Sequence, residues 1–281
     1  MDHTLKIIVL ITLILILDLM KLFFKNDRPH RHGLDMGACM TIGGRDIQED
    51  QYDTLITEAG LMAVLADGAG REFGGRIAAK IAVDTCVEIF KDYNAFNNPQ
   101  YYFRKAFHSA NREIVKVLED ESRGRASAGC VMIRDGFLYY AVAGNVKICV
   151  YRDGSLVPLS VGHTVAVLAE QKFHEGKLSR QDAMCMLEDQ RLYNYLGKDD
   201  FKDIEIFDAP VKLIQDDIVV LMSDGIYECL STRAIEEVLF NENTCQQKAY
   251  ELIELVNTNP AEKKDNASVI LVGIQSEGIR R

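Results

Sequence analysis

The sequence contains no tryptophan, only five prolines, and no Cys-x-x-Cys pair among its seven cysteines. So few prolines, with 20 glycines in 281 residues, exclude a collagen-like or proline-rich chain. Because the cysteines are odd in number and lack paired spacing, a zinc ribbon or a disulfide framework is not expected. Positive charge is also scarce, since 32 Lys and Arg face 42 Asp and Glu for a net charge of −10. Nucleic acid is therefore not an expected partner.

The longest apolar run lies at the N-terminus. Residues 7–24 are near the lower limit of the roughly 17–25 residues that span a bilayer, and a basic stretch at 25–35 follows them. Because basic flanks stay in the cytoplasm, we expect a transmembrane helix at 7–24, with 1–6 outside and the body inside, as a single-pass protein of the cell membrane. A cleaved signal peptide is a weaker alternative, because no A-x-A site follows. A core helix is another, disfavoured by the non-amphipathic pattern.

The body of the chain, residues 36–275, has no boundary or repeat and is expected to be one domain, with a tail at 276–281. Two Asp-Gly pairs, Asp135-Gly136 and Asp153-Gly154, predict tight antiparallel hairpins. Apolar runs of strand length lie at 36–42, 61–66, 130–133, 137–142, 147–151, 218–222 and 267–274. Helical periodicity lies at 75–90, 101–118, 165–174, 179–188, 232–240 and 244–256. Hairpin-joined strands with helices in separate blocks predict a layered α+β fold.

Acidic residues gather where strands end. Asp67 and Asp224 each follow an apolar run and precede a glycine, Asp265 stands just before another run, and Glu49-Asp50 form a doublet. Taken singly, each is most simply a turn or a solvated pair. Together at one sheet edge they would form an all-oxygen site, which suits Mg²⁺ or Mn²⁺ rather than zinc. Without a cation these carboxylates would repel each other.

The order of these motifs resembles a known family. Residues 44–50, 64–70, 223–225 and 265–266 look like the successive motifs of the metal-dependent protein Ser/Thr phosphatases (PPM, or type 2C), over about 36–275. Ala69 makes the chain similar to bacterial members. The resemblance implies a four-layer α-β-β-α sandwich of two mainly antiparallel sheets flanked by helix pairs. In this chain we expect one N-terminal transmembrane helix before it.

The resemblance also implies a reaction, the hydrolysis of phosphoserine and phosphothreonine in proteins. A hydroxide bridging two Mn²⁺ or Mg²⁺ ions would attack the phosphorus, and Arg45 would hold the phosphate with its planar fork. Asp67 would bridge the two ions. The remaining ligands implied are Asp224 and Asp265 for the first ion, and the Gly68 carbonyl with Glu49 and Asp50 for the second.

One position departs from the family. Its G-D-S-R motif stands here as residues 144–147, with the neutral Asn145 where bacterial members use an aspartate to help bind a third metal. We therefore expect an altered third site, with a membrane-tethered pseudophosphatase that binds phosphoproteins as the alternative. A dinucleotide-binding turn at 68–74 is a further alternative, which the antiparallel hairpins contradict. Phosphorylated proteins are the expected partners, a Ser/Thr kinase is another by analogy, and the sequence does not name the substrate.

Overall fold

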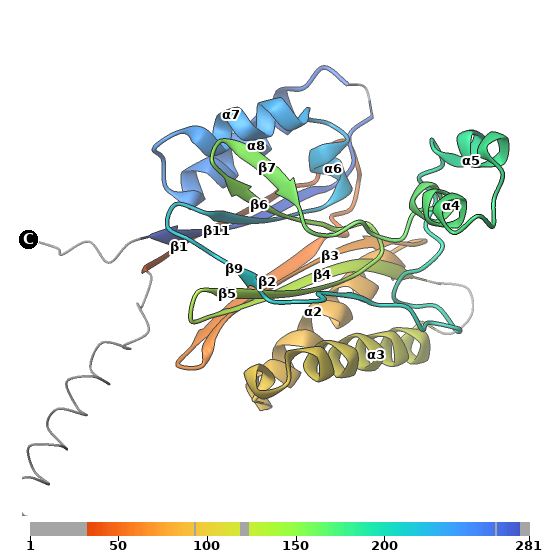
Figure 1. Cartoon of the computed structure of the whole chain (residues 1–281), viewed down its shortest axis with the longest axis horizontal. Coiled ribbons are helices and arrows are strands. Elements are labelled where there is room, and N and C mark those ends of the chain that lie inside the picture. The colour runs from red at the N-terminus through yellow and green to blue at the C-terminus, as the bar shows by residue number, and fades with distance from the viewer. Residues whose placement is uncertain (1–32, 93, 119–123, 262, 276–281) are drawn as a thin grey trace, which may run out of the picture. The chain divides into compact units, whose positions relative to one another are not determined.

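The computed structural model describes residues 33–92, 94–118, 124–261 and 263–275, which form two antiparallel sheets packed face to face (Figure 1). The first sheet has the strand order β1-β11-β10-β6-β7, and the second has β2-β3-β4-β5-β8 with β9 paired to β5. The strands are β1 (Gly33–Thr41), β2 (Gln51–Thr57), β3 (Gly60–Ala69), β4 (Arg125–Arg134), β5 (Phe137–Ala143), β6 (Lys147–Arg152), β7 (Ser155–Pro158), β8 (Glu205–Ile206), β9 (Val211–Lys212), β10 (Ile218–Met222) and β11 (Ala267–Gln275).

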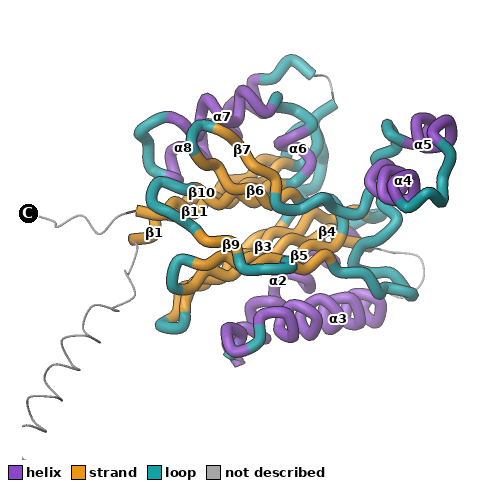
Figure 2. The backbone as a smooth tube through the Cα atoms, viewed as in Figure 1, coloured by secondary structure: helices purple, strands orange, loops and turns teal. Residues whose placement is uncertain are grey.

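Helices cover both outer faces of the sandwich (Figures 1 and 2). α2 and α3 pack on the second sheet, and α7 and α8 pack on the first. α4 and α5 lie beside the sandwich, between β7 and β8 in the chain. The helices are α2 (Gly74–Asp92), the 3-10 turn η1 (Ala95–Asn97), α3 (Pro99–Val117), α4 (Val165–His174), α5 (Arg180–Met186), α6 (Asp224–Tyr227), α7 (Thr232–Phe240) and α8 (Cys245–Thr258).

Side-chain alternation along β3 builds two apolar layers at once. Leu61, Ala63 and Leu65 face the layer between the sheets, while Met62 and Val64 face the layer under α2 and α3. All five side chains are fully buried. A strand buried on both faces reads as a continuous apolar run, which is why this segment was recognisable from the sequence.

The turn and cap residues act as their chemistry predicts. Asp135 and Gly136 have φ of 51° and 75°, and Asp153 and Gly154 have φ of 50° and 83°, so both hairpins use two successive positive-φ residues. The Ser179 hydroxyl accepts a hydrogen bond from the backbone N–H of Asp182 and begins α5. Both predicted hairpins are confirmed.

The four-layer sandwich agrees with the expected fold, but the predicted fold class is wrong in its membrane-spanning helix. No helix among the described residues is both long enough and apolar enough to cross a bilayer. Residues 7–24, on which that prediction fell, lie outside the described residues. The fold class of the described residues is therefore the four-layer sandwich. The predicted domain limits stay predictions.

Candidate metal centre

The alternation of β3 carries Asp67 to one end of the space between the sheets. Leu61, Ala63 and Leu65 face this space, and Asp67 is the next residue on the same face. Asp67 lies within β3, paired with Ser127 of β4, rather than beyond the end of its strand as the sequence suggested. A position inside a hydrogen-bonded ladder fixes the backbone of this carboxylate.

The glycines that follow the two aspartates are required by close packing. A Cβ on Gly68 would collide with the carbonyl of Gly75, and a Cβ on Gly225 would collide with the carbonyl of Asn266. Neither glycine has a positive φ, and Gly68 lies within β3 and Gly225 within α6, so neither is there to form a turn. Glycine is needed here because two backbone segments meet without room for a side chain.

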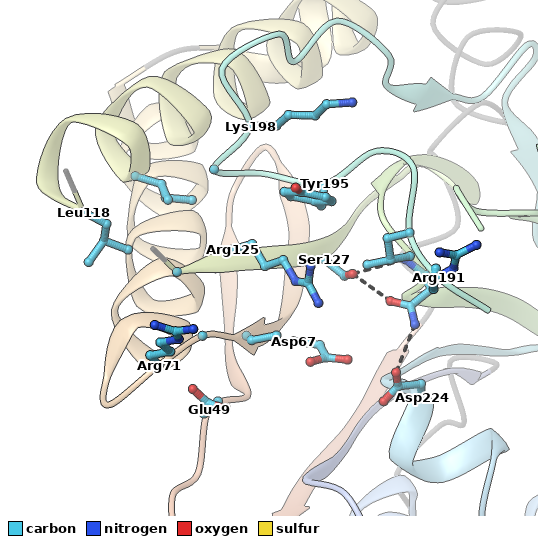
Figure 3. A pocket seen from close by; sticks show the side chains of 18 of the residues that line it. Glu49, Asp67, Arg71, Leu118, Arg125, Ser127, Arg191, Tyr195, Lys198 and Asp224 are labelled. Atoms are coloured by element: carbon cyan, nitrogen blue, oxygen red, sulfur yellow. Dashed lines mark hydrogen bonds between the residues drawn. The ribbon is translucent and has the colours of Figure 1, made fainter. Parts of the chain in front are cut away.

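A cavity of about 1060 Å³ opens at this end of the sandwich. Residues from separate parts of the chain line it, and Figure 3 shows the side chains of Glu49, Asp67 and Asp224 around it. Of the residues predicted for the site, the cavity brings together Arg45, Glu49, Asp67, Gly68, Asp224 and Asp265.

Asp50 is the predicted site residue that does not line the cavity. It is 1% exposed, and its Oδ2 accepts hydrogen bonds from the hydroxyls of Ser223 over 2.9 Å and Ser268 over 2.7 Å. Burial raises the pKa of Asp50 to about 7, against the lowering effect of the two hydroxyls. Asp50 therefore joins its own loop to the residue before Asp224 and to β11, underneath the cavity.

Asn266 anchors the loop that carries the doublet. Its Oδ1 accepts the backbone N–H of Glu49 over 2.7 Å, and its Nδ2 donates to the carbonyls of Ile42 over 2.9 Å and Ile47 over 3.0 Å. The side chain is buried, and these bonds use all the polar atoms of its amide. One amide thus holds the segment with Arg45 against the start of β11.

The carboxyl groups of Asp67 and Asp224 interact strongly. Burial raises the pKa of Asp67 well above its ordinary value, and the charges of Asp224, Asp50 and Asp265 raise it further. The pKa of Asp224 is also raised, first by burial, although a hydrogen bond from Asn145 Nδ2 over 3.0 Å opposes the shift. Carboxylates collected in this way are electrostatically incomplete without positive charge.

One of these carboxylates already forms an ion pair with an arginine side chain. An Arg45 guanidinium nitrogen lies 2.6 Å from Asp265 Oδ2. In the described part of the chain, no group of three or more His, Cys, Asp or Glu side chains has closed into a shell that could hold a metal ion. The predicted ligands thus share a cavity, with one of them paired to an arginine.

The chemistry of the donors nevertheless fits a hard cation. The side-chain atoms that Glu49, Asp67, Asp224 and Asp265 offer to a metal ion are all carboxylate oxygens. Glu49 Oε1 is buried and has no hydrogen-bond partner among the described residues, and burial raises the pKa of this carboxyl, although the backbone N–H groups of Gly75 and Arg76 oppose the shift. A divalent ion would satisfy a buried acceptor that lacks a hydrogen-bond partner and lies beside carboxyl groups of raised pKa.

Apart from Asn145, sequence reasoning assigned no role to the small polar residues of the site. Ser223 and Ser268 hold Asp50, Ser127 and Asn145 bond each other over 2.7 Å, and Asn266 holds the loop. Serine and asparagine carry no distinctive spacing. Adjacency is the one signal available, because Ser223 directly precedes Asp224 and Asn266 directly follows Asp265.

Comparison with known proteins identifies the family. The model of the protein phosphatase 2C family matches residues 42–264, so the chain belongs to that family. A serine/threonine phosphatase, stp, of Listeria monocytogenes is 25% identical over 218 residues, which cover 75% of this chain and 83% of that protein. The protein phosphatase PhpP of Streptococcus pneumoniae is 25% identical over 238 residues, 83% of this chain and 94% of the relative. The enzyme class expected from the sequence, a protein-serine/threonine phosphatase of the bacterial kind, is confirmed.

Solved structures share the fold. A serine/threonine phosphatase of S. agalactiae has a TM-score of 0.73 and 23% identity, and the match covers 86% of this chain and 100% of that one. The catalytic domain of the phosphatase PstP, solved in complex with two manganese ions, has a TM-score of 0.68 and 20% identity over 86% of this chain and 98% of its own.

Proposed function

We propose that this phosphatase hydrolyses phosphoserine and phosphothreonine in proteins with two Mn²⁺ or Mg²⁺ ions held at the acidic end of the cavity. The carrying observation is the convergence of Asp67, Asp224, Asp265 and Glu49 on one cavity, with the pKa values of Asp67, Asp224 and Glu49 raised. When bound, the ions would supply the charge that offsets these carboxylates and would activate water for attack on phosphorus. The two manganese ions of PstP support this assignment by analogy.

The ligands that we propose are those that the family resemblance implies, and the lining of the cavity supports them. Asp67 stands between the two sheets and would serve both ions, with Asp224 and Asp265 on one side and Glu49 and the Gly68 carbonyl on the other. Rigid strands and loops tied by hydrogen bonds hold these groups before any ion arrives. Asp50 would act beneath them through the serine hydroxyls that it holds, or through water.

Arg45 would bind the phosphate of the substrate. Its side chain is 60% exposed, lines the cavity and is paired with Asp265, whose side chain is 43% exposed. An exposed pair of this kind contributes only about 0–1 kcal/mol, so a phosphate can replace the carboxylate. The guanidinium fork matches two phosphate oxygens, and it would orient the phosphorus and offset its charge.

Asn145 supports an altered third-metal site. Its Nδ2 donates to Asp224 and its Oδ1 accepts from Ser127, so both ends of the amide are engaged. A neutral amide is a poorer ligand for a hard cation than a carboxylate, and we infer a lower affinity for a third ion. The same substitution is the one observation that favours the alternative function, a pseudophosphatase that binds phosphoproteins with little turnover. A partner Ser/Thr kinase stays a prediction.

One assay separates the two functions. The full chain, incubated with Mn²⁺ and p-nitrophenyl phosphate, should release nitrophenol, and EDTA or the Asp224→Asn substitution should abolish the release. Binding of Mn²⁺ without turnover at any metal concentration would favour the pseudophosphatase.

A further inference from the structure

Positive side chains share the cavity with the carboxylates. Besides the predicted phosphate ligand Arg45, further cations from separate segments line it, namely Arg71, Arg125, Arg191 and Lys198. These cations can offset the carboxylates or bind an anion of the substrate, and the contacts of each distinguish the two roles.

Two of these cations already have partners. Arg191 forms a bidentate pair with Asp189, with contacts of 2.5 to 3.0 Å, and Lys198 Nζ donates to the carbonyl of Tyr193 over 2.8 Å. Arg71 and Arg125 form no ion pair with any residue that the structure describes. Among the cations that line the cavity, Arg71 and Arg125 are thus the two whose side chains have neither an ion pair nor a hydrogen bond with a described residue.

The sheet register fixes the position of Arg125. Arg125 is the first residue of β4 and pairs with Ala69, while Ser127 pairs with Asp67. Residues two apart on a strand face the same side and are about 6–7 Å apart, so Arg125 stands one step along the strand from the row that contains Asp67. Figure 3 shows its side chain extending from β4 into the cavity near Ser127 and Asp67.

The neighbours of Arg125 leave its guanidinium open. Ala126 forms a backbone bridge with Leu196, which brings Tyr195 and Gly197 beside the start of β4. The Arg125 guanidinium carbon lies 5.3 Å from the centre of the Tyr195 ring, a cation–π contact that orients the fork and uses none of its N–H donors. No described residue accepts a hydrogen bond from those donors, so they can serve a ligand in the cavity.

We propose that Arg125, assisted by the charge of Arg71, binds a second anionic group on the substrate, a carboxylate or a second phosphate two residues from the phosphorylated residue. An extended peptide places side chains two residues apart on one face at the same spacing of about 6–7 Å. The planar fork of arginine matches carboxylate and phosphate alike. This inference rests on the proposed function and names its substrate class as acidic or multiply phosphorylated segments.

Matched phosphothreonine peptides test the proposal with the full chain and Mn²⁺. The peptides differ only at the second position on each side of the phosphothreonine, which is glutamine, glutamate or a further phosphothreonine. We expect a kcat/KM about tenfold higher for the glutamate peptide than for the glutamine peptide, and higher still for the phosphothreonine peptide. A ratio of about tenfold is what one charge-assisted hydrogen bond to the transition state would give. Arg125→Gln should bring these ratios close to one, and Arg125→Lys should retain part of them.

A charge-matched control is Arg112→Gln on α3. Arg112 bonds Ser109 on the helix surface and does not line the cavity, so this variant should keep the wild-type ratios. A preference for the phosphothreonine peptide alone would assign the subsite to phosphate. A wild-type ratio near one, or a ratio that survives Arg125→Gln, would overturn the proposal.

Failure of the proposed function has a separate signature. Wild-type protein that hydrolyses neither the peptides nor p-nitrophenyl phosphate refutes turnover. In that case the ratio of the peptide Kd values, measured by fluorescence anisotropy, still decides the inference. Equal Kd values for the glutamate and glutamine peptides would overturn it, and tighter binding of the glutamate peptide that is lost in Arg125→Gln would support it.

Discussion

The amide of Asn145 bonds directly to the carboxylate of Asp224, with 3.0 Å between Asn145 Nδ2 and Asp224 Oδ2. An aspartate at position 145 would replace this donor with a second carboxylate at the same place. The pair would then repel unless a cation lay between its members. Asn145 therefore supplies a hydrogen bond where a carboxylate would need a metal ion.

We expect Asn145→Asp to raise Mn²⁺-dependent turnover by several-fold while lowering the Tm in EDTA by about 2–4 °C, the shift of roughly 1 kcal/mol in a domain of this size. Enzyme assays over a series of Mn²⁺ concentrations and thermal unfolding would measure both effects. Ser127→Ala, which removes the partner at the other end of the amide, is the control. Turnover unchanged at every Mn²⁺ concentration would refute the altered third site and leave the two-metal core untouched.

Asp224→Asn should remove activity and stabilise the metal-free protein together. Turnover should fall by about 10²-fold or more, because a ligand to the ions is lost. In EDTA the Tm should rise or stay level, since one of the repelling carboxylates is gone. The rise in Tm that Mn²⁺ gives the wild type should shrink. If Asp224→Asn lowered the Tm in EDTA markedly, Asp224 would be a structural residue.

The metal-free protein should become less stable as the pH rises from about 4 to 7. The pKa values of Asp50, Asp67 and Asp224 are raised in the folded state, to about 7 for Asp50. The folded protein therefore holds more protons than the unfolded chain in this range, and the free energy of unfolding falls as they are released. Mn²⁺ should oppose the fall, because cations favour the ionised carboxylates.

Thermal unfolding in EDTA between pH 4.5 and 7.5 measures this effect. Asp50→Asn, which keeps a side chain of the same shape between the two serine hydroxyls, should flatten the dependence. A Tm that climbed toward neutral pH in EDTA would show that the carboxylates are stabilised in their ionised form without metal.

Asn266→Ala should reduce activity more than its position behind the ligands suggests. The substitution removes the bonds that hold Glu49 and the carbonyls of Ile42 and Ile47, and leaves buried polar atoms unsatisfied at about 1–3 kcal/mol each. We expect a loss of about tenfold or more in turnover, together with a lower Tm. Asn259→Ala, which loses two side-chain hydrogen bonds where Asn266→Ala loses three, lies away from the cavity and should lower stability alone.

Strong local chemistry made much of the fold predictable. Both hairpins were predictable from their Asp-Gly pairs, 135–136 and 153–154, because few other residue pairs adopt two positive φ angles in succession. β2 escaped notice because Gln51–Thr57 is half exposed and mixes polar with apolar residues. β8 and β9 are two residues long, too short for any periodicity.

The candidate site, like the fold, was predictable from the sequence only in part. The acidic residues were recognisable because carboxylates beside apolar runs are unusual and four such motifs occur in order. The contacts that position them were not, because the pairing of Arg45 with Asp265 joins residues 220 apart in the sequence. The open guanidinium of Arg125 depends on the register of β4 against β3, which no local pattern encodes.

The place of β11 in the first sheet bears on how the enzyme is made. This last strand lies between β1 and β10. The side-chain amide of Asn266, which directly precedes β11, holds the loop that follows β1 in the chain. Asp265 thus joins the acidic cavity, and an interior strand joins the first sheet, only after β11 has been synthesised and has left the ribosome. A partly synthesised chain that lacks β11 would therefore not hold the two-ion site that we propose.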